Sequence, residues 1–139
     1  MIVLDTNVVS EAMRPNANGR VLHWLNAQDV RTLHLTAISL AELAFGIAAL
    51  PDGRRKADLR ARLRATEKRV FANRILPFDR QAAEAYAERM ATARAGGRGV
   101  GQSDGQIAAI AAANGMIVAS RDTEPFRAIG VEVIDPWTA

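Results

Sequence analysis

The stretch that decides the fold is "IVLDTNVVSE" (Ile2 to Glu11), near the start of the chain. Three apolar residues run directly into an aspartate, a threonine and an asparagine. A short aliphatic run bounded by polar residues is typical of a central strand in a parallel sheet, which is buried on both faces. The strand therefore ends on an acid, Asp5, whose only local structural role would be to cap a turn formed by residues 6–8.

Strand-like and helix-like segments alternate along the rest of the chain. Apolar residues at helical spacing predict helices over 18–28, 39–50 and 53–71, and further helices that begin at Ser10, Arg80, Ser103 and Thr123. Asp52 and Asp79 are predicted to cap two of these helices, and Gly115 to end another. Short apolar runs predict strands at 32–36, 75–78, 116–120 and 131–135. This alternation indicates an α/β fold with a central, mainly parallel sheet of about five strands flanked by helices.

Length and composition favour one globular domain spanning residues 1–139. The chain is 49% hydrophobic and 24% charged, which is enough apolar content to form a core. Neither a membrane span nor a leader with a basic and then an apolar segment is recognisable, so we expect a cytoplasmic protein. The lack of cysteine excludes disulfides, thiol nucleophiles and cysteine metal sites.

Four acids are candidates for one functional site. Ligands of open parallel sheets bind outside the carboxyl ends of the strands. Asp5 lies at one such end, and Asp122 follows the predicted strand "MIVAS" closely. Glu42 and Asp104 lie in the first turns of predicted helices. Because a returning helix begins near the carboxyl end of a strand, we expect the four carboxylates to converge.

Each acid also has a simpler structural interpretation. Ser39 with Glu42, and Ser103 with Gln106, have the spacing of capping boxes. Asp122 could cap the following short helix. Taken singly, each acid is explained by such a local role at least as well as by catalysis.

Glu42 is the acid that a capping role explains least well. It is the only charged residue between Ser39 and Leu50, and an ordinary surface helix carries several. We therefore expect it to be at least partly buried, with Gly46 leaving space beside it. A buried charge is costly unless it is paired or binds a metal.

These segments resemble PIN-domain ribonucleases, and specifically the FitB-like branch of the VapC toxins of toxin–antitoxin pairs. The matching segments span the chain in order: "IVLDTNVVSE", "TAISLAELAFGI", "QSDGQIAAIAAANG", "IVASRDTEPF" and "VEVIDPW". The resemblance implies a PIN-like three-layer fold. It also implies a catalytic acidic quartet, with three neighbouring polar residues in support: Asp5, Glu42, Asp104 and Asp122, supported by Thr6, Asn7 and Ser120.

Four carboxylates in one cleft suit a hard divalent cation. Mg²⁺ and Mn²⁺ prefer carboxylate and water oxygens, and Mg²⁺ uses only one or two carboxylates directly. Asp5 and Asp104 are the expected direct ligands, with Glu42 and Asp122 binding directly or through water. The predicted reaction is hydrolysis of RNA. Neither His23 nor His34 lies in a motif, so we expect both to have packing roles.

Other families that carry an aspartate at a strand end fit less well. A haloacid-dehalogenase phosphatase needs a second acid two residues later, where this chain has Asn7. A receiver domain needs a late lysine, and none follows Lys68. The glycine-rich loop 96–101 lacks the lysine of a P-loop, although Arg94 and Arg98 could contact phosphate there. A non-catalytic PIN-like protein or RNA-binding module remains the alternative.

Partners are indicated by surface composition and by the family resemblance. The basic segment 53–69 could contact RNA, although a solvated charged face is the commoner explanation. The apolar segment 39–50 would expose too much surface if it were left uncovered. Resemblance to VapC implies a homodimer and a VapB-type antitoxin that blocks the cleft, inserting an arginine among the acids.

Overall fold

A five-stranded parallel sheet forms the centre of the molecule. The computed structural model describes residues 1–139. Its strands lie in the order β3-β2-β1-β4-β5, and every neighbouring pair is parallel. Their bounds are β1 (Ile2–Leu4), β2 (Leu33–Thr36), β3 (Ile75–Leu76), β4 (Ile117–Ala119) and β5 (Val133–Ile134). The predicted sheet is therefore confirmed in both strand number and direction.

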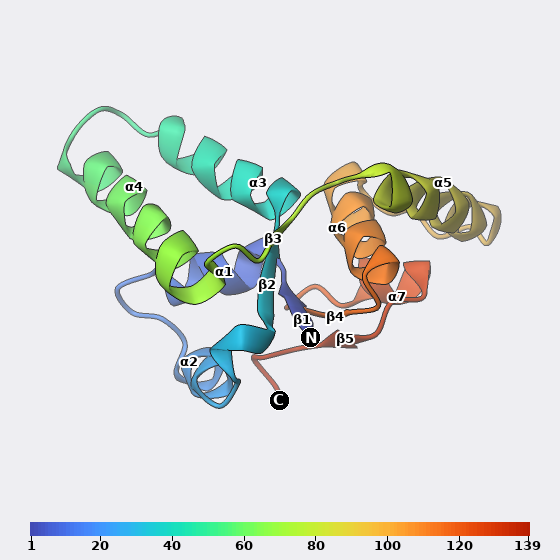
Figure 1. Cartoon of the computed structure of the whole chain (residues 1–139), viewed down its shortest axis with the longest axis horizontal. Helices are drawn as coiled ribbons and strands as arrows, with labels where there is room; N and C mark the ends of the chain where they lie inside the picture. Colours follow the sequence, from blue (N-terminus) through green and yellow to red (C-terminus); the bar gives the residue numbers. More distant parts are fainter.

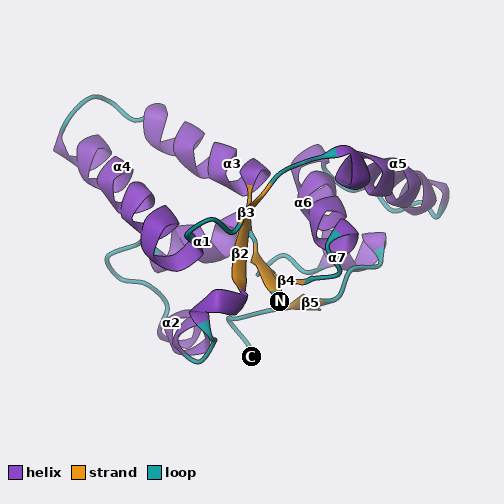
Figure 2. Ribbon diagram, viewed as in Figure 1, coloured by secondary structure: helices purple, strands orange, loops and turns teal.

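Seven α-helices flank this sheet in two groups (Figures 1 and 2). The first group comprises α1 (Thr6–Ala12), α2 (Gly19–Asn26), α3 (Ala37–Ala48) and α4 (Arg54–Thr66). The second comprises α5 (Arg80–Ala95), α6 (Gln102–Ala113) and α7 (Glu124–Ile129). A 3₁₀ turn (Val30–Thr32) and a wide π-type turn (Glu67–Phe71) complete the helical segments.

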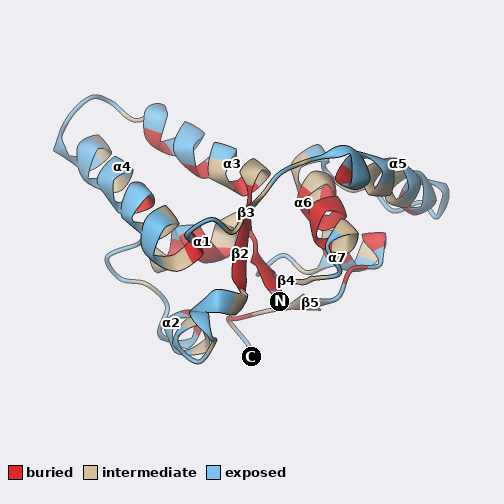
Figure 3. Cartoon of the chain, in the orientation of Figure 1, coloured by how far each residue is buried: buried red, intermediate tan, exposed pale blue.

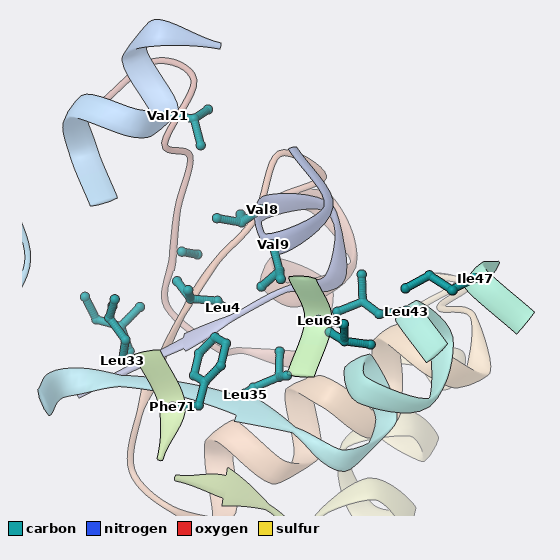
Figure 4. Packing of buried hydrophobic residues seen from close by; sticks show 12 residues of the cluster. Leu4, Val8, Val9, Val21, Leu33, Leu35, Leu43, Ile47, Leu63 and Phe71 are labelled. Atoms are coloured by element: carbon teal, nitrogen blue, oxygen red, sulfur yellow. The ribbon is translucent and has the colours of Figure 1, made fainter. Parts of the chain in front are cut away.

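Alternating side chains of the strands supply a core on each face of the sheet. Leu4 contributes to the cluster that also holds side chains from α1 to α4, whereas Val3 contributes to the cluster of α6 and α7. Figure 4 shows the first cluster, in which the Phe71 ring packs among leucines and valines of the sheet and helices. The central strands β1, β2 and β4 and the helix α6 are largely buried, whereas the outer faces of α3 and α4 are exposed (Figure 3). The result is the expected three-layer arrangement.

Several helix boundaries differ from the prediction. α1 begins at Thr6, not Ser10, because Asp5 caps it. The helix predicted over 53–71 ends at Thr66, and the residues that follow form the wide π-type turn. Asp52 does not cap it; Asp52 instead pairs with Lys56, with 3.1 Å between Nζ and Oδ1. Asp79 caps α5 as predicted, accepting from the Ala82 backbone N–H.

Candidate active site

Asp5 lies where the order of strands reverses. The chain runs from β1 outward to β2 and β3 on one side, and to β4 and β5 on the other. The backbone of Asp5 still belongs to the sheet, since its N–H donates to the Ala119 carbonyl at 2.9 Å. Its carboxylate therefore sits at the crevice between the ends of β1 and β4, the usual ligand position in open α/β sheets.

The Asp5 carboxylate is buried and held at both oxygens. The residue is only 4% exposed. Oδ1 accepts from the Thr6 backbone N–H at 2.8 Å, and Oδ2 accepts from the Ser120 hydroxyl at 2.7 Å. The Asn7 amide lies 3.4 Å from Oδ2 and 3.2 Å from Ser120 Oγ. The three supporting residues that the resemblance implied are thus gathered around Asp5.

Burial raises the pKa of Asp5 from 3.8 to about 6. The hydrogen bonds from Ser120 and from the Thr6 N–H oppose this rise. The negative charges of Asp104 and Glu42 add to it. Asp5 is thus a carboxylate whose ionised form a nearby positive charge would stabilise.

Asp104 lies in the first turn of α6, close to the other acids. Burial raises the pKa of Asp104, and the charges of Asp122 and Glu42 raise it further. The capping box considered as an alternative at Ser103 does not form, because the helix begins at Gln102, after Gly101, with no side-chain cap. At Gly105 an added Cβ would lie 2.7 Å from Met90 Sδ, so α5 packs directly beside this turn.

Glu42 is held differently from the prediction. α3 begins at Ala37 and is capped by Thr36, whose hydroxyl accepts from the Ser39 N–H at 3.0 Å. Glu42 therefore lies in the second turn, and the capping-box interpretation is wrong. The expected burial is also wrong: Glu42 is exposed, because the space beside Gly46 is open. Its Oε1 accepts from the Thr6 hydroxyl at 2.8 Å.

Asp122 is exposed at the carboxyl side of β4. It does not cap α7, whose N-cap residue is Thr123 and makes no side-chain cap bond. The Asp122 backbone N–H instead donates to Ser120 Oγ at 3.1 Å. Its carboxylate faces the site closely enough to raise the pKa of Asp104.

The four acids converge, and they do so without basic partners. Each of the pairs Asp5–Asp104, Asp5–Glu42, Asp104–Asp122 and Asp104–Glu42 interacts by charge repulsion. None of the four takes part in an ion pair. No three His, Asp or Glu side chains are grouped closely enough to enclose a metal ion by themselves. The donor set is therefore one of hard oxygens that suits a cation retaining several waters, as Mg²⁺ does.

Neither histidine belongs to this site. His34 is buried in β2, and its Nδ1 lies 2.9 Å from the Thr32 carbonyl. His23 is exposed on α2. Of the two arginines expected near phosphate, Arg94 is exposed at the end of α5, whereas Arg98 pairs with Glu124 at 2.5 Å.

A groove of about 1310 Å³ lies beside Glu42, the one member of the four acids that lines it. Glu42 and Thr6 line it, together with apolar side chains of α3 and α4, including Leu43, Ile47 and Leu59. The basic residues Arg14, Arg54, Arg55 and Arg62 also line it. It is an amphipathic channel between α1, α3 and α4.

Two hydroxyl groups near Glu42 were missed at the level of sequence. Thr36 supplies the helix cap, and Ser39 is fully buried, with its Oγ 2.9 Å from Thr6 Oγ1. The signal for Ser39 was its position three residues before Glu42, which places both on one face of the helix. That spacing was interpreted as a capping box instead.

Comparison with known proteins gives consistent matches over the whole chain. A model of the PIN domain family matches residues 2–132. The VapC ribonuclease Y4jK of Sinorhizobium fredii is 48% identical over 137 residues, covering 99% of this chain and 98% of that protein. Toxin FitB of Neisseria gonorrhoeae is 44% identical over 137 residues, covering 99% of both. The crystal structure of FitAcB from Neisseria gonorrhoeae superposes with a TM-score of 0.95 at 43% identity, covering 100% of both chains.

Proposed function

The chain belongs to the PIN domain family, and we propose that it is a metal-dependent endoribonuclease, the toxin of a VapBC-type toxin–antitoxin pair. One observation carries this proposal. A buried aspartate at the switch point of a parallel sheet lies among three other acids, and none of the four has a basic partner. Unpaired negative charge of this kind is stabilised by a cation.

Asp5 and Asp104 are the proposed direct ligands of Mg²⁺ or Mn²⁺, with Glu42 and Asp122 binding directly or through water. When bound, the ion supplies a water of lowered pKa and positive charge beside the attacked phosphate. The Ser120 and Thr6 hydrogen bonds favour the ionised form of Asp5 and partly offset the effect of burial on its pKa. The exposed Glu42 and Asp122 lie on the solvent side, where the phosphodiester would enter.

RNA is the proposed substrate, in keeping with the VapC ribonuclease relative. Arg94 and Arg98 are proposed phosphate contacts, and Arg98 would have to leave Glu124 to act as one. The basic side chains of α4 that line the groove could add non-specific attraction to a polyanion. Because its substrate is cellular RNA, the activity is proposed to be cytoplasmic; no helix of the chain is long and apolar enough to cross a bilayer.

The groove and α3 are the proposed surfaces for partners. A groove lined by both apolar side chains and arginines fits an amphipathic antitoxin segment. An arginine of that segment would pair with Glu42 and the other unpartnered acids beside it. The Phe45 side chain of α3 is 74% exposed, which is unusual for a phenylalanine. A homodimer that covers such apolar surface completes the proposal.

The test is cleavage of RNA by the purified chain. We expect cleavage in Mg²⁺ or Mn²⁺, its loss in excess chelator and its recovery when the metal is restored. Asp5→Asn, purified in the same way, controls for contaminating nuclease. Full cleavage in chelator would exclude the mechanism, and RNA binding without any cleavage would identify a binding module instead.

A further inference from the structure

Ser39 is a buried polar residue that the proposed mechanism does not use. It lies in the first turn of α3 and is completely shielded from solvent. Its backbone N–H is satisfied by Thr36, but its side chain is turned toward α1. Ser39 Oγ lies 2.9 Å from Thr6 Oγ1, which in turn lies 2.8 Å from Glu42 Oε1.

The direction of these two hydrogen bonds follows from the number of protons available. An ionised carboxylate can only accept, so the single hydroxyl proton of Thr6 is donated to Glu42. Thr6 then has no proton left for Ser39, and the Ser39 hydroxyl must donate to Thr6 Oγ1. The three side chains form a directed chain from Ser39 through Thr6 to Glu42. Hydrogen bonds in such a chain polarise one another and strengthen the terminal bond.

Thr6 is the only residue that donates hydrogen bonds to the carboxylates of two of the acids. Its backbone N–H donates to Asp5 Oδ1, and its hydroxyl donates to Glu42 Oε1. The backbone contact is fixed by the start of α1, but the hydroxyl can rotate. The hydrogen bond from the Ser39 hydroxyl to Thr6 Oγ1 restricts this rotation.

Glu42 depends on this restraint more than the other acids do. It is exposed, makes no ion pair and has no other hydrogen-bond donor to its carboxylate. An exposed glutamate otherwise samples several rotamers and loses that freedom when it binds a ligand. A preset carboxylate binds with a smaller entropic cost.

We infer that Ser39 is a positioning residue, which sets the Glu42 carboxylate toward the metal site through the hydroxyl of Thr6. This inference rests on the proposed function, because it assigns Glu42 to the site. Ser39 itself touches neither metal nor substrate. It acts from the buried side of the helix on a carboxylate at the exposed side.

The first test is made in chelator and needs no metal. Three-bond coupling constants of the Glu42 side chain, measured by NMR, report its rotamers. We expect one dominant rotamer in the wild type and averaged values in Ser39→Ala and in Thr6→Val. Thr6→Ser keeps the hydroxyl and should keep the single rotamer. Averaged couplings in the wild type, or unchanged couplings in Ser39→Ala, would overturn the inference.

The second test is Mn²⁺ affinity, measured from the electron paramagnetic resonance signal of free Mn²⁺. Ser39→Ala and Thr6→Val should each raise the dissociation constant about tenfold, a usual effect for residues that orient ligands. The two changes break one chain, so the double variant should bind no more weakly than Thr6→Val alone. Ser10→Ala, an exposed serine on α1, should bind as the wild type does.

The results separate the two proposals. If the increases in the Mn²⁺ dissociation constant caused by Ser39→Ala and Thr6→Val multiply in the double variant, the positioning role is contradicted. Wild-type affinity in Ser39→Ala would contradict it as well. A wild type that holds one Glu42 rotamer and binds no Mn²⁺ would instead overturn the proposed metal-dependent function, while the role of Ser39 in placing Glu42 stands.

Discussion

Asp5 and Glu42 belong to the same cleft but are held in opposite ways. Asp5 ends a central strand, is buried, and is fixed by a backbone N–H and the Ser120 hydroxyl. Glu42 stands exposed in the second turn of α3 and is held by one threonine hydroxyl. The sheet places the first acid, whereas a contact between two helices places the second.

This difference separates two requirements of the proposed metal site. Burial at the sheet edge raises the pKa of Asp5, so that a bound cation would favour its ionised form. Exposure of Glu42 and Asp122 leaves room for waters and for a phosphodiester. A site made only of acids like Asp5 would be closed to substrate, and one made only of acids like Glu42 would be loosely ordered.

The largest expected effect comes from neutralising the buried acid. Asp5→Asn keeps the shape of the side chain and removes its charge, so RNA cleavage should fall roughly 10³-fold, the upper range for losing one electrostatic group in an active site. Asp52→Asn, at an exposed acid in the turn before α4, should cleave normally. Retention of more than a tenth of wild-type turnover by Asp5→Asn would remove Asp5 from the mechanism.

The pH dependence of stability should also reveal Asp5. In the folded, metal-free protein its pKa is raised from 3.8 to about 6. Between those values the folded state binds more protons than the unfolded state, so this group's effect on stability becomes less favourable as pH rises. Relative to Asp5→Asn, the wild type should lose roughly 2.4 kcal/mol of unfolding free energy between pH 4 and pH 7.

Urea unfolding of both proteins in chelator at several pH values measures this difference. The variant controls for every other titrating group, because only residue 5 differs. Parallel curves of unfolding free energy against pH for the two proteins would show that the pKa of Asp5 is not raised in the folded protein.

An intermediate effect is expected at the exposed acid. Glu42→Gln can still accept from Thr6, so unfolding free energy should change by less than about 0.5 kcal/mol. Cleavage should fall roughly 10- to 100-fold, because the amide is a poor ligand for a hard cation. Glu88→Gln on α5, also exposed, is the matched control. Unchanged turnover in Glu42→Gln would make Glu42 a surface residue only.

How much of this site could be predicted from sequence differs between the two acids. Asp5 was predictable because three apolar residues before it define a strand, and the ends of parallel strands share one edge. The strand count and direction followed from the same alternation of segments. These features depend on patterns within a few residues.

The environment of Glu42 could not be predicted in the same way. Thr6 and Ser39 lie 33 residues apart, and their contact depends on how α1 packs against α3. Both alternative capping-box interpretations failed for a related reason: an upstream residue, Thr36 or Gly101, started each helix earlier. Local spacing indicates that a helix begins nearby, but the preceding strand or loop decides at which residue.

The smallest expected effect concerns the support of Asp5. The Ser120 hydroxyl lowers the pKa of Asp5, and a hydrogen bond to a charged group contributes about 1.5 kcal/mol or more. Ser120→Ala should therefore raise the pKa of Asp5 by about one unit. The apparent pKa of the acid limb in the pH profile of kcat/KM should rise by about the same amount. At pH values below that pKa, kcat/KM should be roughly tenfold lower than in the wild type. An unmoved limb would show that Ser120 does not tune the site.

The central claim is that four acids share one cation site at the end of the sheet. The most direct measurement is thermal unfolding of the wild type, Asp5→Asn and Asp104→Asn, each in chelator and in Mn²⁺. In chelator both variants should be at least as stable as the wild type, because each relieves repulsion. Mn²⁺ at a hundredfold excess over its dissociation constant should stabilise the wild type by about 2.7 kcal/mol, and the variants by clearly less. Variants that are destabilised equally with and without metal would contradict the shared site and reduce the acids to independent structural residues.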